Sequence, residues 1–243
     1  MLLSDPPSIR RFDDQLKTHP VTIPSYLGRF ILRTHKEDDT SVLASIFSDP
    51  ITMKHLPFLQ PPGGWGDDEK RKKEKQWTEQ DIAERVKVHN QTRSNGKSCV
   101  LNIILLASKS GEKEDRCIGV SGYVTIDDET GYLGIIIDHK MTRMGYATEA
   151  LYTSIVFAFE KLGIRKIVIQ TGEANEEMRG WCEKTAGLKL AWKKEIQING
   201  YPHTECGYTF TVDEWESSVK QKLEAKMRVE FAGRTFHSTR RDN

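Results

Sequence analysis

Residues 134–151 read GIIIDHKMTRMGYATEAL, which is an apolar run, a short basic loop and then a helical pattern. The apolar run has the length of a buried strand, and apolar residues after Gly145 recur at helical spacing. The start of a helix presents unpaired N–H groups and a partial positive charge. Gly145 and the small Ala147 would let a bulky anion approach those groups, with Lys140 and Arg143 as cations beside it. The stretch predicts a strand, a pyrophosphate-binding loop and a helix; the alternative is that Gly145 is only a turn residue.

Further strands and helices are predicted on both sides of this stretch, because the period of the apolar residues changes along the chain. Asn199-Gly200 is a strong two-residue hairpin signal between two strand patterns. The hairpin and the strand-rich middle favour a mixed α/β fold over a nucleotide-binding domain with a parallel sheet. The predicted strands are 29–34, 99–106, 117–126, 132–138, 167–169, 188–198 and 204–212. The predicted helices are a first helix that ends at Asp49-Pro50, residues 145–162, residues 175–185 and a C-terminal helix that starts near Trp215.

The segment between residues 56 and 86 is more ambiguous. Proline and glycine are too dense at 56–66 for regular structure. The run 67–75 is charged at nearly every position and is predicted to begin a helix that continues through Trp77 to Val86. Acidic residues nearly cancel the basic ones in this run, so a solvated helix is favoured over a nucleic-acid contact.

The composition describes a soluble protein with a modest core. The chain has 243 residues, of which 37% are apolar and 29% charged, with a formal net charge of +1. This balance predicts neither nucleic acid nor an anionic membrane as a partner. The N-terminus has no apolar signal core and no window is long enough to span a membrane, so we expect a cytoplasmic protein. The four cysteines are widely spaced, which favours buried reduced thiols over a metal site.

Three segments are predicted from the distribution of prolines and apolar residues. Residues 1–27 contain four of the nine prolines and no apolar period, and we expect them to form an N-terminal arm. Residues 28–215 would form the main domain, and 216–243 a helical C-terminal extension. The extensions could cover a substrate cleft or build a dimer contact, and the sequence leaves both a monomer and a homodimer open.

Residues 145–150, GYATEA, resemble the acetyl-CoA signature of the GNAT acetyltransferases, in the style of the branch named for ribosomal-protein N-terminal (RimJ/RimL-like) acetyltransferases. Other segments resemble the same branch in the same order along the chain. They are Leu32-Arg33 with Glu37-Asp38, residues 48–53, Asn175 with Glu183-Lys184 and Gly187-Leu188, and Asp213-Glu214-Trp215. The resemblance implies a mixed, mostly antiparallel twisted sheet that is flanked by helices and splayed at its central strands.

The sequence departs from the pattern of that branch at four places. Thr142 stands where the family usually has Gln or Arg, although Arg143 follows it and could supply the charge. Met178 replaces a serine after Asn175, and the corner that follows is one residue longer. Gly131-Tyr132 stands where many relatives have a carboxylate. These differences affect the expected catalytic groups more than the expected cofactor site.

The resemblance implies direct transfer of an acetyl group from acetyl-CoA to a primary amine, without a metal and without an acyl-enzyme. The backbone of the central strand would pair with the pantetheine arm and hold the thioester oxygen. Tyr208 is then the candidate acid for the leaving thiolate, and Glu129 the candidate base acting through water. The residues expected to bind the cofactor are Ile135, Ile136, Ile137, Arg143, Met144, Gly145, Tyr146, Ala147, Thr148 and Asn175.

The acceptor amine must lose its proton before it attacks. An α-amine with a pKa near 7.7 is neutral in about a sixth of molecules at pH 7, whereas a lysine-type amine near 10.4 is neutral in roughly 0.04%. A site without a well-placed carboxylate therefore favours a peptide N-terminus or a small amine-bearing molecule. Trp65 could line the amine pocket or anchor its loop to the core, and His139 is expected to be exposed. The alternative function is a non-catalytic module that binds acyl-CoA or a partner on the same fold.

Overall fold

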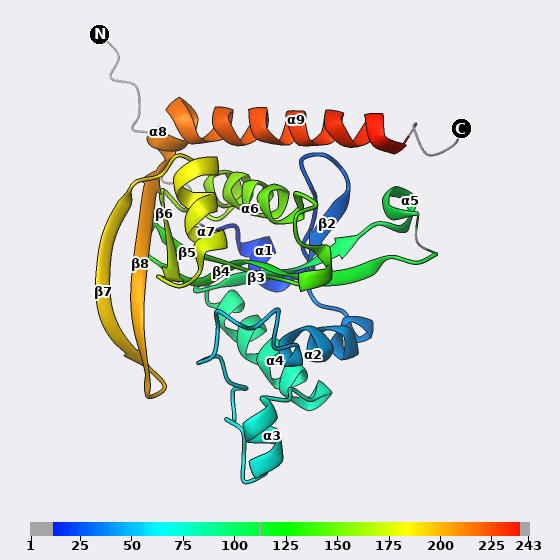
Figure 1. Cartoon of the computed structure of the whole chain (residues 1–243), viewed down its shortest axis with the longest axis vertical. Coiled ribbons are helices and arrows are strands. Elements are labelled where there is room, and N and C mark those ends of the chain that lie inside the picture. The colour runs from blue at the N-terminus through cyan, green and yellow to red at the C-terminus, as the bar shows by residue number, and fades with distance from the viewer. Residues whose placement is uncertain (1–11, 112, 239–243) are drawn as a thin grey trace.

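The computed structural model describes residues 12–111 and 113–238, and the strands of that part form one sheet (Figure 1). The strand order is β1-β2-β3-β4-β5-β6-β8-β7. Neighbouring strands are antiparallel except for β5 and β6, which are parallel. The sheet confirms the predicted mixed, mostly antiparallel architecture. The strands are β1 (Thr22–Pro24), β2 (Phe30–Arg33), β3 (Cys99–Leu105), β4 (Arg116–Asp127), β5 (Thr130–Ile137), β6 (Lys166–Gly172), β7 (Leu190–Ile198) and β8 (Tyr201–Thr211).

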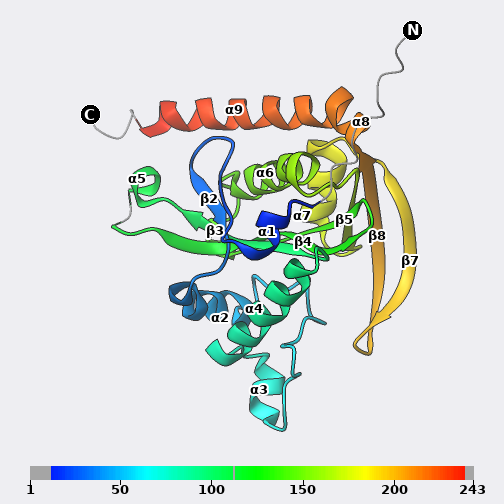
Figure 2. The same ribbon diagram turned by 180° about the vertical axis from the view of Figure 1, so that it is seen from behind.

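Helices cover both faces of this sheet. The long helices α6 (Tyr146–Lys161) and α9 (Lys220–Ser238) lie on one face, whereas α2 (Thr40–Ser48) and α4 (Glu79–Ser94) lie on the other (Figures 1 and 2). The shorter helices are α1 (Asp14–Thr18), α3 (Glu69–Glu74), α5 (Ala107–Ser110), α7 (Glu176–Gly180) and α8 (Val212–Glu214), with 3₁₀ turns at Glu37–Asp39 and His139–Met141 and π-helical turns at Trp181–Thr185 and Trp215–Val219.

Two hydrophobic cores result, because successive strand residues point to opposite faces of the sheet. In β3, Leu101 and Ile103 belong to the core under α6 and α9, whereas Ile104 belongs to the core under α2 and α4. The same alternation holds in β5, where Ile135 and Ile137 face one core and Ile136 faces the other. Strands that are covered on both faces read as continuous apolar runs, which explains the pattern at 134–137.

The sheet opens into a fork between β5 and β6. Residues 130–132 of β5 pair with residues 166–168 of β6, and no further pair joins these two strands beyond Tyr132 and Val168. On its other side β5 stays paired with β4 as far as Ile137. The outer half of β5 is therefore one arm of the fork and the end of β6 is the other. This geometry confirms the predicted splay at the central strands.

Gly119 in β4 allows the backbone of the β5 arm to lie close beside it. Its φ is +151°, and a Cβ atom built there would lie 2.1 Å from the carbonyl oxygen of Ile136. No real side chain tolerates such a contact, so any substitution at Gly119 would push β5 away. The position of Ile136 at the fork thus depends on the absence of a side chain on the neighbouring strand.

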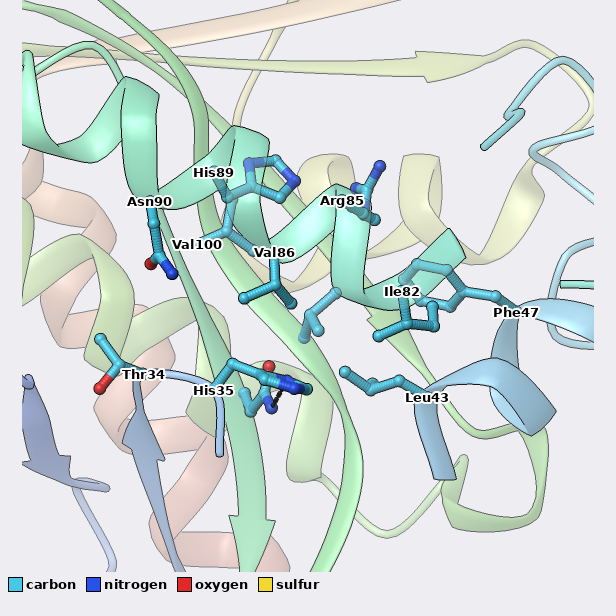
Figure 3. Close-up of a pocket in the computed structure, with 12 residues that line it drawn as sticks. Thr34, His35, Leu43, Phe47, Ile82, Arg85, Val86, His89, Asn90 and Val100 are labelled. Atoms are coloured by element: carbon cyan, nitrogen blue, oxygen red, sulfur yellow. Dashed lines mark hydrogen bonds between the residues drawn. The ribbon is translucent and has the colours of Figure 1, made fainter. Parts of the chain in front are cut away.

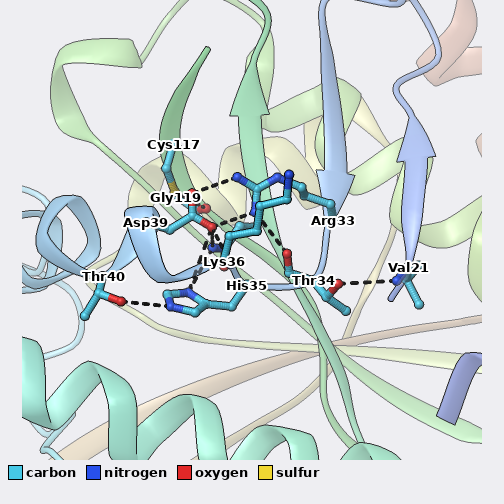
Figure 4. A network of polar contacts seen from close by, with 10 residues as sticks. Val21, Arg33, Thr34, His35, Lys36, Asp39, Thr40, Cys117 and Gly119 are labelled. Carbon is cyan, nitrogen blue, oxygen red and sulfur yellow. Dashed lines mark hydrogen bonds and ion pairs between the residues drawn. The ribbon is translucent and has the colours of Figure 1, made fainter. Parts of the chain in front are cut away.

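A buried ion pair fixes the start of α2 against β2 and β3 (Figure 4). Arg33 donates to the two carboxylate oxygens of Asp39 at 2.7 and 2.8 Å, and the side-chain amide of Asn102 donates to Asp39 at 2.8 Å. Burial raises the pKa of Asp39, but hydrogen bonds from Arg33, the backbone N–H of Lys36 and Asn102 outweigh it, so this pKa lies below its ordinary value.

The prediction of one helix from residue 67 through Trp77 to Val86 is wrong. α3 ends at Glu74, and its C-cap residue Lys75 has a left-handed φ of +51°. α4 starts after Thr78, whose side chain and that of Asp81 form a capping box. Trp77 lies between the two helices and is buried against Phe47 and Trp65. A single straight helix from residue 67 to Val86 could not bury Trp77 in the core under α2 and α4 and also keep the charged residues 67–75 in water.

The other predicted elements are confirmed to within a few residues. Asn199 and Gly200 have φ values of +49° and +78°, as a tight hairpin turn between β7 and β8 requires. Pro202, which lacks an N–H group, lies beyond the part of β8 that pairs with β6. The C-terminal helix is present, interrupted by the π turn at Trp215–Val219.

Both predicted extensions contact the main body of the fold. In the N-terminal segment β1 pairs with β2, and in the C-terminal one Leu223 and Met227 are buried, while the hydroxyl of Tyr152 in α6 donates to Glu224 at 2.7 Å. Residues 1–11 and 239–243 lie outside the described part. The division of the chain after residues 27 and 215 stays a prediction.

Candidate active site

The β5 arm of the fork offers an unpaired backbone edge. Residues 133–137 pair with β4 on one side, and no pair with β6 uses the other side. The three isoleucines 135–137 are each half-buried. A peptide-like chain laid along this edge could pair with its N–H and C=O groups as an added strand would.

The first turn of α6 lies close to the end of this arm in the sequence. Arg143 and Gly145 have left-handed φ values of +60° and +74°, and Gly145 is the N-cap residue of α6. Gly145 has no side chain, so no cap satisfies the first N–H groups of the helix, and these groups remain available to a ligand. Arg143 and Lys140 are exposed beside this turn, as the predicted anion site requires.

Arg29 holds this turn in place from the N-terminal side of the fold. Its Nε donates to Glu149 Oε2 at 2.6 Å, and its Nη1 donates to the carbonyl oxygen of Met144 at 2.8 Å. The guanidinium also lies over the ring of Tyr146, 4.5 Å from its centroid. The backbone N–H of Leu27 donates to the other oxygen of Glu149, whose side chain is fully buried. One arginine therefore links three residues of the stretch 144–149.

The loop between β5 and α6 is held from the opposite face of the sheet. Nδ1 of His139 lies 2.8 Å from Asp49 Oδ2, and the backbone N–H of His139 donates to Thr52 Oγ1 at 3.1 Å. Burial raises the pKa of Asp49, but hydrogen bonds from Thr52 and His139 lower it below its ordinary value. The prediction that His139 is simply exposed is therefore wrong, since its side chain is 30% exposed and fixes the loop to the end of α2.

Asn175 lies at the end of the β6 arm and is the N-cap residue of α7. Its Oδ1 accepts a hydrogen bond from the backbone N–H of Met178 at 3.1 Å, and its Nδ2 donates to Thr171 Oγ1 at 3.0 Å. These two bonds give Asn175 a clear structural role as a helix cap. They also fix the orientation of its amide at the fork.

A buried carboxylate, Glu205 of β8, lies beside the β6 arm on the face away from α6. Its neighbours Cys206 and Tyr208 belong to the core under α6, so alternation places Glu205 on the opposite face. Its Oε1 is hydrogen-bonded to Gln170, Trp192 and Lys194 at 3.1, 3.0 and 3.1 Å. Within the described residues no hydrogen bond reaches Oε2.

Glu205 stays ionised at neutral pH. Burial raises its pKa, but the hydrogen bonds from Trp192 and Lys194, together with the charge of Lys194, hold the pKa below its ordinary value. Glu205 pairs with Gly172, which is four residues beyond Val168 on β6, as Ile136 is four residues beyond Tyr132 on β5. The carboxylate thus lies beside the fork at the level of the unpaired edge of β5.

The segment 49–66, which we call the strap, connects both arms on this same face. It binds the end of β5 through the Asp49–His139 contact, and it binds α7 through Glu177, which accepts from Lys54 at 2.7 Å and lies 3.2 Å from His55 Nε2. Phe58 contacts the β7–β8 hairpin. Trp65 is buried in the core under α2 and α4, which supports an anchor rather than a pocket wall.

Neither predicted catalytic side chain faces the open fork. Tyr208 is fully buried and its hydroxyl donates to Glu183, while burial and then this carboxylate raise its pKa well above the ordinary value. Glu129 precedes β5 at the end opposite to the fork, roughly 20 Å along the strand from Ile136 at about 3.3 Å per residue. Its carbonyl accepts from the N–H groups of Arg165 and Lys166, which is a structural contact.

Sequence patterns did not single out Arg29 or Glu205. Arg29 carries a charge at the start of a predicted strand, and Glu149 lies inside the quoted motif, but nothing in the sequence links the two. Glu205 lies in a strand whose neighbouring residues Cys206 and Tyr208 are buried in the other core. The available signal for Glu205 was a lone carboxylate in a strand pattern, which is too weak to identify a site.

Residues 12–111 and 113–238 show neither a metal site nor a membrane-spanning helix. That part of the chain contains no cluster of three or more His, Cys, Asp or Glu side chains arranged to hold a metal ion. None of its helices has the length and apolar character needed to cross a membrane. All four cysteines are buried and free, as predicted, and burial raises the pKa values of Cys99, Cys117 and Cys182 to about 12.

Comparisons with known proteins agree with this geometry. A family model described as an acetyltransferase (GNAT) domain matches residues 29–187. Among solved structures, a GNAT-family acetyltransferase from Bacillus anthracis covers 80% of this chain and 100% of its own, with a TM-score of 0.60 and 19% identity. A search of curated protein sequences finds no match.

Two further similar structures contain coenzyme A or its disulfide. RimJ of Mycobacterium smegmatis, in complex with CoA-disulfide, covers 87% of this chain and 96% of its own, with a TM-score of 0.64 and 17% identity. RimL, a ribosomal L7/L12 alpha-N-protein acetyltransferase in complex with coenzyme A, covers 79% and 99%, with a TM-score of 0.60 and 15% identity. Identities this low establish the fold, whereas the family model covers more than half of the chain: the protein belongs to the GNAT acetyltransferase family.

Proposed function

We propose that this protein transfers an acetyl group from acetyl-CoA directly to the primary amine of a peptide N-terminus or a small molecule. The observation that carries the proposal is the unpaired β5 edge at 133–137, followed after a short loop by the uncapped N-terminus of α6. The first feature suits the amide groups of a pantetheine arm, and the second suits a pyrophosphate. A single ligand that carries both groups is coenzyme A.

Each part of the site has a proposed role in holding that ligand. The backbone of Ile135, Ile136 and Ile137 would pair with the pantetheine amides. Met144, Gly145, Tyr146, Ala147 and Thr148 would direct backbone N–H groups at the pyrophosphate, with Arg143 as a counter-charge. Acetyl-CoA supplies the acetyl group as an activated thioester. Asn175 would fix the β6 arm and orient its amide toward the fork.

Glu205 replaces Glu129 as the proposed acidic group of the reaction. Its pKa lies below the ordinary value, so it is a weak proton acceptor but a permanent negative charge. With Oε2 free of hydrogen bonds from the described residues, it can attract an ammonium group and hold it near the fork. An α-amine can then lose its proton to water at modest cost, because its pKa in water is near 7.7, although the charge of Glu205 raises that pKa while the ammonium is held. A lysine side chain, with a pKa near 10.4, would require about 4.6 kcal/mol for the same step.

The strap supports an acceptor that enters as a narrow group. It joins the end of β5 to α7 and to the β7–β8 hairpin on the face where Glu205 lies. A chain terminus or a compact amine passes such a strap more easily than a side chain on a folded surface. The solved structure of RimL, described as an alpha-N-protein acetyltransferase, is consistent with an acceptor of this kind.

A second candidate function is a module that binds acyl-CoA or a partner without catalysis. It is favoured by the positions of Tyr208 and Glu129, neither of which faces the fork, and by Met178 at the usual serine position. This module would bind acetyl-CoA as tightly as an enzyme does but would acetylate no amine.

The test is calorimetric binding of acetyl-CoA to the wild-type protein, to Gly145→Glu and to Gly111→Glu. Gly111 also has a left-handed φ, +78°, and a Cβ atom there meets no other atom within 4 Å, so it is a matched control for strain and charge. We expect Gly145→Glu to lose binding and Gly111→Glu to retain it. Absence of wild-type affinity at millimolar acetyl-CoA, or equal binding by the two variants, would refute the cofactor assignment.

A screen of peptide N-termini and small amines then separates the enzyme from the non-catalytic module. Acetylation of an α-amine in preference to lysine supports the proposed acceptor. Equal or better turnover on lysine side chains contradicts it, and binding without any turnover supports the module.

A further inference from the structure

A pocket lies between the helices α2 and α4 and the face of the sheet formed by β3 and β4, with Thr34 and His35 after β2 at its edge (Figure 3). Its lining contains no residue of β5, β6 or the stretch 134–151, so it is distinct from the fork. Val86, Val100 and Val120 give it an apolar wall. Arg85 and His89, one turn apart on α4, are the polar groups that its chemistry depends on (Figure 3).

Arg85 is a half-buried cation, and no carboxylate of the described residues pairs with it. Within the described residues no hydrogen bond or ion pair involves its guanidinium, which lies 5.3 Å from the ring centroid of Phe47 and 6.0 Å from that of Trp77. Burial lowers the pKa of Arg85 to about 10, and no acidic neighbour restores it. The side chain remains charged at neutral pH, and no carboxylate of the described residues neutralises it.

His89 adds an unused hydrogen-bonding group next to this cation. Its Nε2 is buried and has no partner among the described residues. Burial, and then the charge of Arg85, lower the pKa of His89 to about 4, so the ring is neutral at pH 7. A neutral imidazole can carry its proton on Nε2 and donate it to an acceptor in the pocket.

Asp39, which contacts the lining residue Asn102 from behind the opposite wall, does not neutralise Arg85. Asp39 accepts hydrogen bonds from Arg33, Asn102 and the backbone N–H of Lys36 (Figure 4). The nearby ring of His35, which lines the pocket, is bonded to Asn102 and Thr40. The polar groups of that wall are therefore satisfied, while those on α4 are not.

We propose that this pocket binds a monocarboxylate with a compact apolar body, whose carboxylate is held by Arg85 and His89 and whose body lies against Val86, Val100 and Val120. A carboxylate would supply Arg85 with its missing counter-ion and His89 Nε2 with an acceptor. Val120 pairs with Ile136, so the pocket is one strand away from the fork. The carboxylate could belong to a free organic acid or to the acceptor amine itself.

The test is calorimetric titration of the full chain with benzoate, and with benzamide as the neutral molecule of the same shape. We expect saturable binding of benzoate, and binding of benzamide that is weaker by about tenfold or more, because a charge-assisted hydrogen bond is lost. Arg85→Gln should weaken benzoate binding by about tenfold or more. Lys87→Gln, an exposed position on the same helix, should leave it unchanged.

A filling variant keeps the test decisive if Arg85→Gln does not fold. Val86→Phe retains both polar groups but occupies the apolar wall, and it should abolish benzoate binding. The proposal fails if the wild-type protein shows no saturable binding at millimolar benzoate, or if Arg85→Gln or Val86→Phe binds benzoate as Lys87→Gln does. These outcomes involve neither acetyl-CoA nor turnover, so they are independent of the proposed function.

Turnover then identifies the source of the carboxylate. If the acceptor carries it, 4-(aminomethyl)benzoate should be acetylated more efficiently than benzylamine, and benzoate should compete with it. If a free acid carries it, benzoate should change the acetylation rate of benzylamine without competing with that amine.

Discussion

Variants of the buried pair Arg29–Glu149 can change the stability of the fold and the affinity of the proposed cofactor site independently of each other. Arg29→Met removes the donor to Glu149 Oε2, the donor to the carbonyl of Met144 and the cation over Tyr146. The Glu149 side chain is 0% exposed and that of Arg29 is 15% exposed, so the variant leaves a buried carboxylate with the N–H of Leu27 as its remaining donor. Breaking such a pair from one side costs about 3–5 kcal/mol.

We therefore expect urea denaturation to show a free energy of unfolding that is about 3–5 kcal/mol lower for Arg29→Met than for the wild type. In the double variant Arg29→Met with Glu149→Met, no uncompensated charge remains. Its free energy of unfolding should return to within about 2 kcal/mol of the wild-type value, because an apolar pair of similar volume often replaces a buried ion pair without loss.

The double variant should nevertheless bind acetyl-CoA about tenfold more weakly, since the carbonyl of Met144 has lost the donor that orders the loop before α6. Arg228→Met, on the exposed side of α9, is the control, and it should change neither quantity. The reasoning is wrong if Arg29→Met costs less than about 1 kcal/mol, or if the double variant is less stable than both single variants. It is also wrong if the restored double variant binds acetyl-CoA as the wild type does.

Three further outcomes are expected. Arg143→Gly should raise the free energy of unfolding by up to about 1 kcal/mol, because glycine adopts the left-handed backbone without strain. The same variant should bind acetyl-CoA more weakly, because the counter-charge to the pyrophosphate is lost. A gain in affinity would contradict the role of Arg143. Asp39 has a folded pKa below its ordinary value of 3.8, so its contribution is complete above that pH and is lost as the pH falls through the folded pKa. Acid titration of stability should show this loss in the wild type and not in Asp39→Asn, which should already be less stable at pH 7 by about 3–5 kcal/mol; equal acid slopes would refute it. Lys54→Ala should change the free energy of unfolding by less than about 1 kcal/mol, because its ion pair with Glu177 is exposed. Both Lys54→Ala and Glu177→Gln should nevertheless change the KM for the acceptor amine. An unchanged KM in both variants would show that the strap does not contact the acceptor.

Local patterns predicted most of the fold because most of its elements are fixed by local physics. The apolar runs of β3 and β5, the hairpin at Asn199-Gly200 and the helix after Gly145 each depend on period, burial or backbone conformation over a few residues. The failure at α3 and α4 has the opposite origin. Trp77 interrupts the helix because it packs into a core built by residues distant in sequence, such as Phe47. A charged run that continues into an apolar pattern does not reveal such a contact.

The same distinction between local and distant contacts applies to the candidate site. The proposed cofactor site is contiguous in sequence, since the β5 edge, the loop and the first turn of α6 follow one another within residues 133–151. The catalytic surroundings are assembled from Glu205 on β8, the strap after α2 and Asn175 after β6, which no spacing rule connects. Glu129 is close to β5 in sequence, but the two ends of a strand lie far apart in space, and the fork lies at the end away from Glu129.

The same geometry limits the chemistry that the fork can perform. A carboxylate held by Trp192, Lys194 and Gln170 is stabilised as an anion, and every donor that lowers its pKa makes it a poorer base. Under the proposed function, Glu205 can therefore bind the ammonium form of an amine, but it cannot readily deprotonate an amine of high pKa. Replacing Trp192 by Phe removes one donor and should raise the pKa of Glu205. If Glu205 acts as proposed, this change should shift turnover of an α-amine little and should improve turnover of a lysine side chain. If instead both activities fall equally, Glu205 serves the structure of the β6–β8–β7 arm and does not bind the amine.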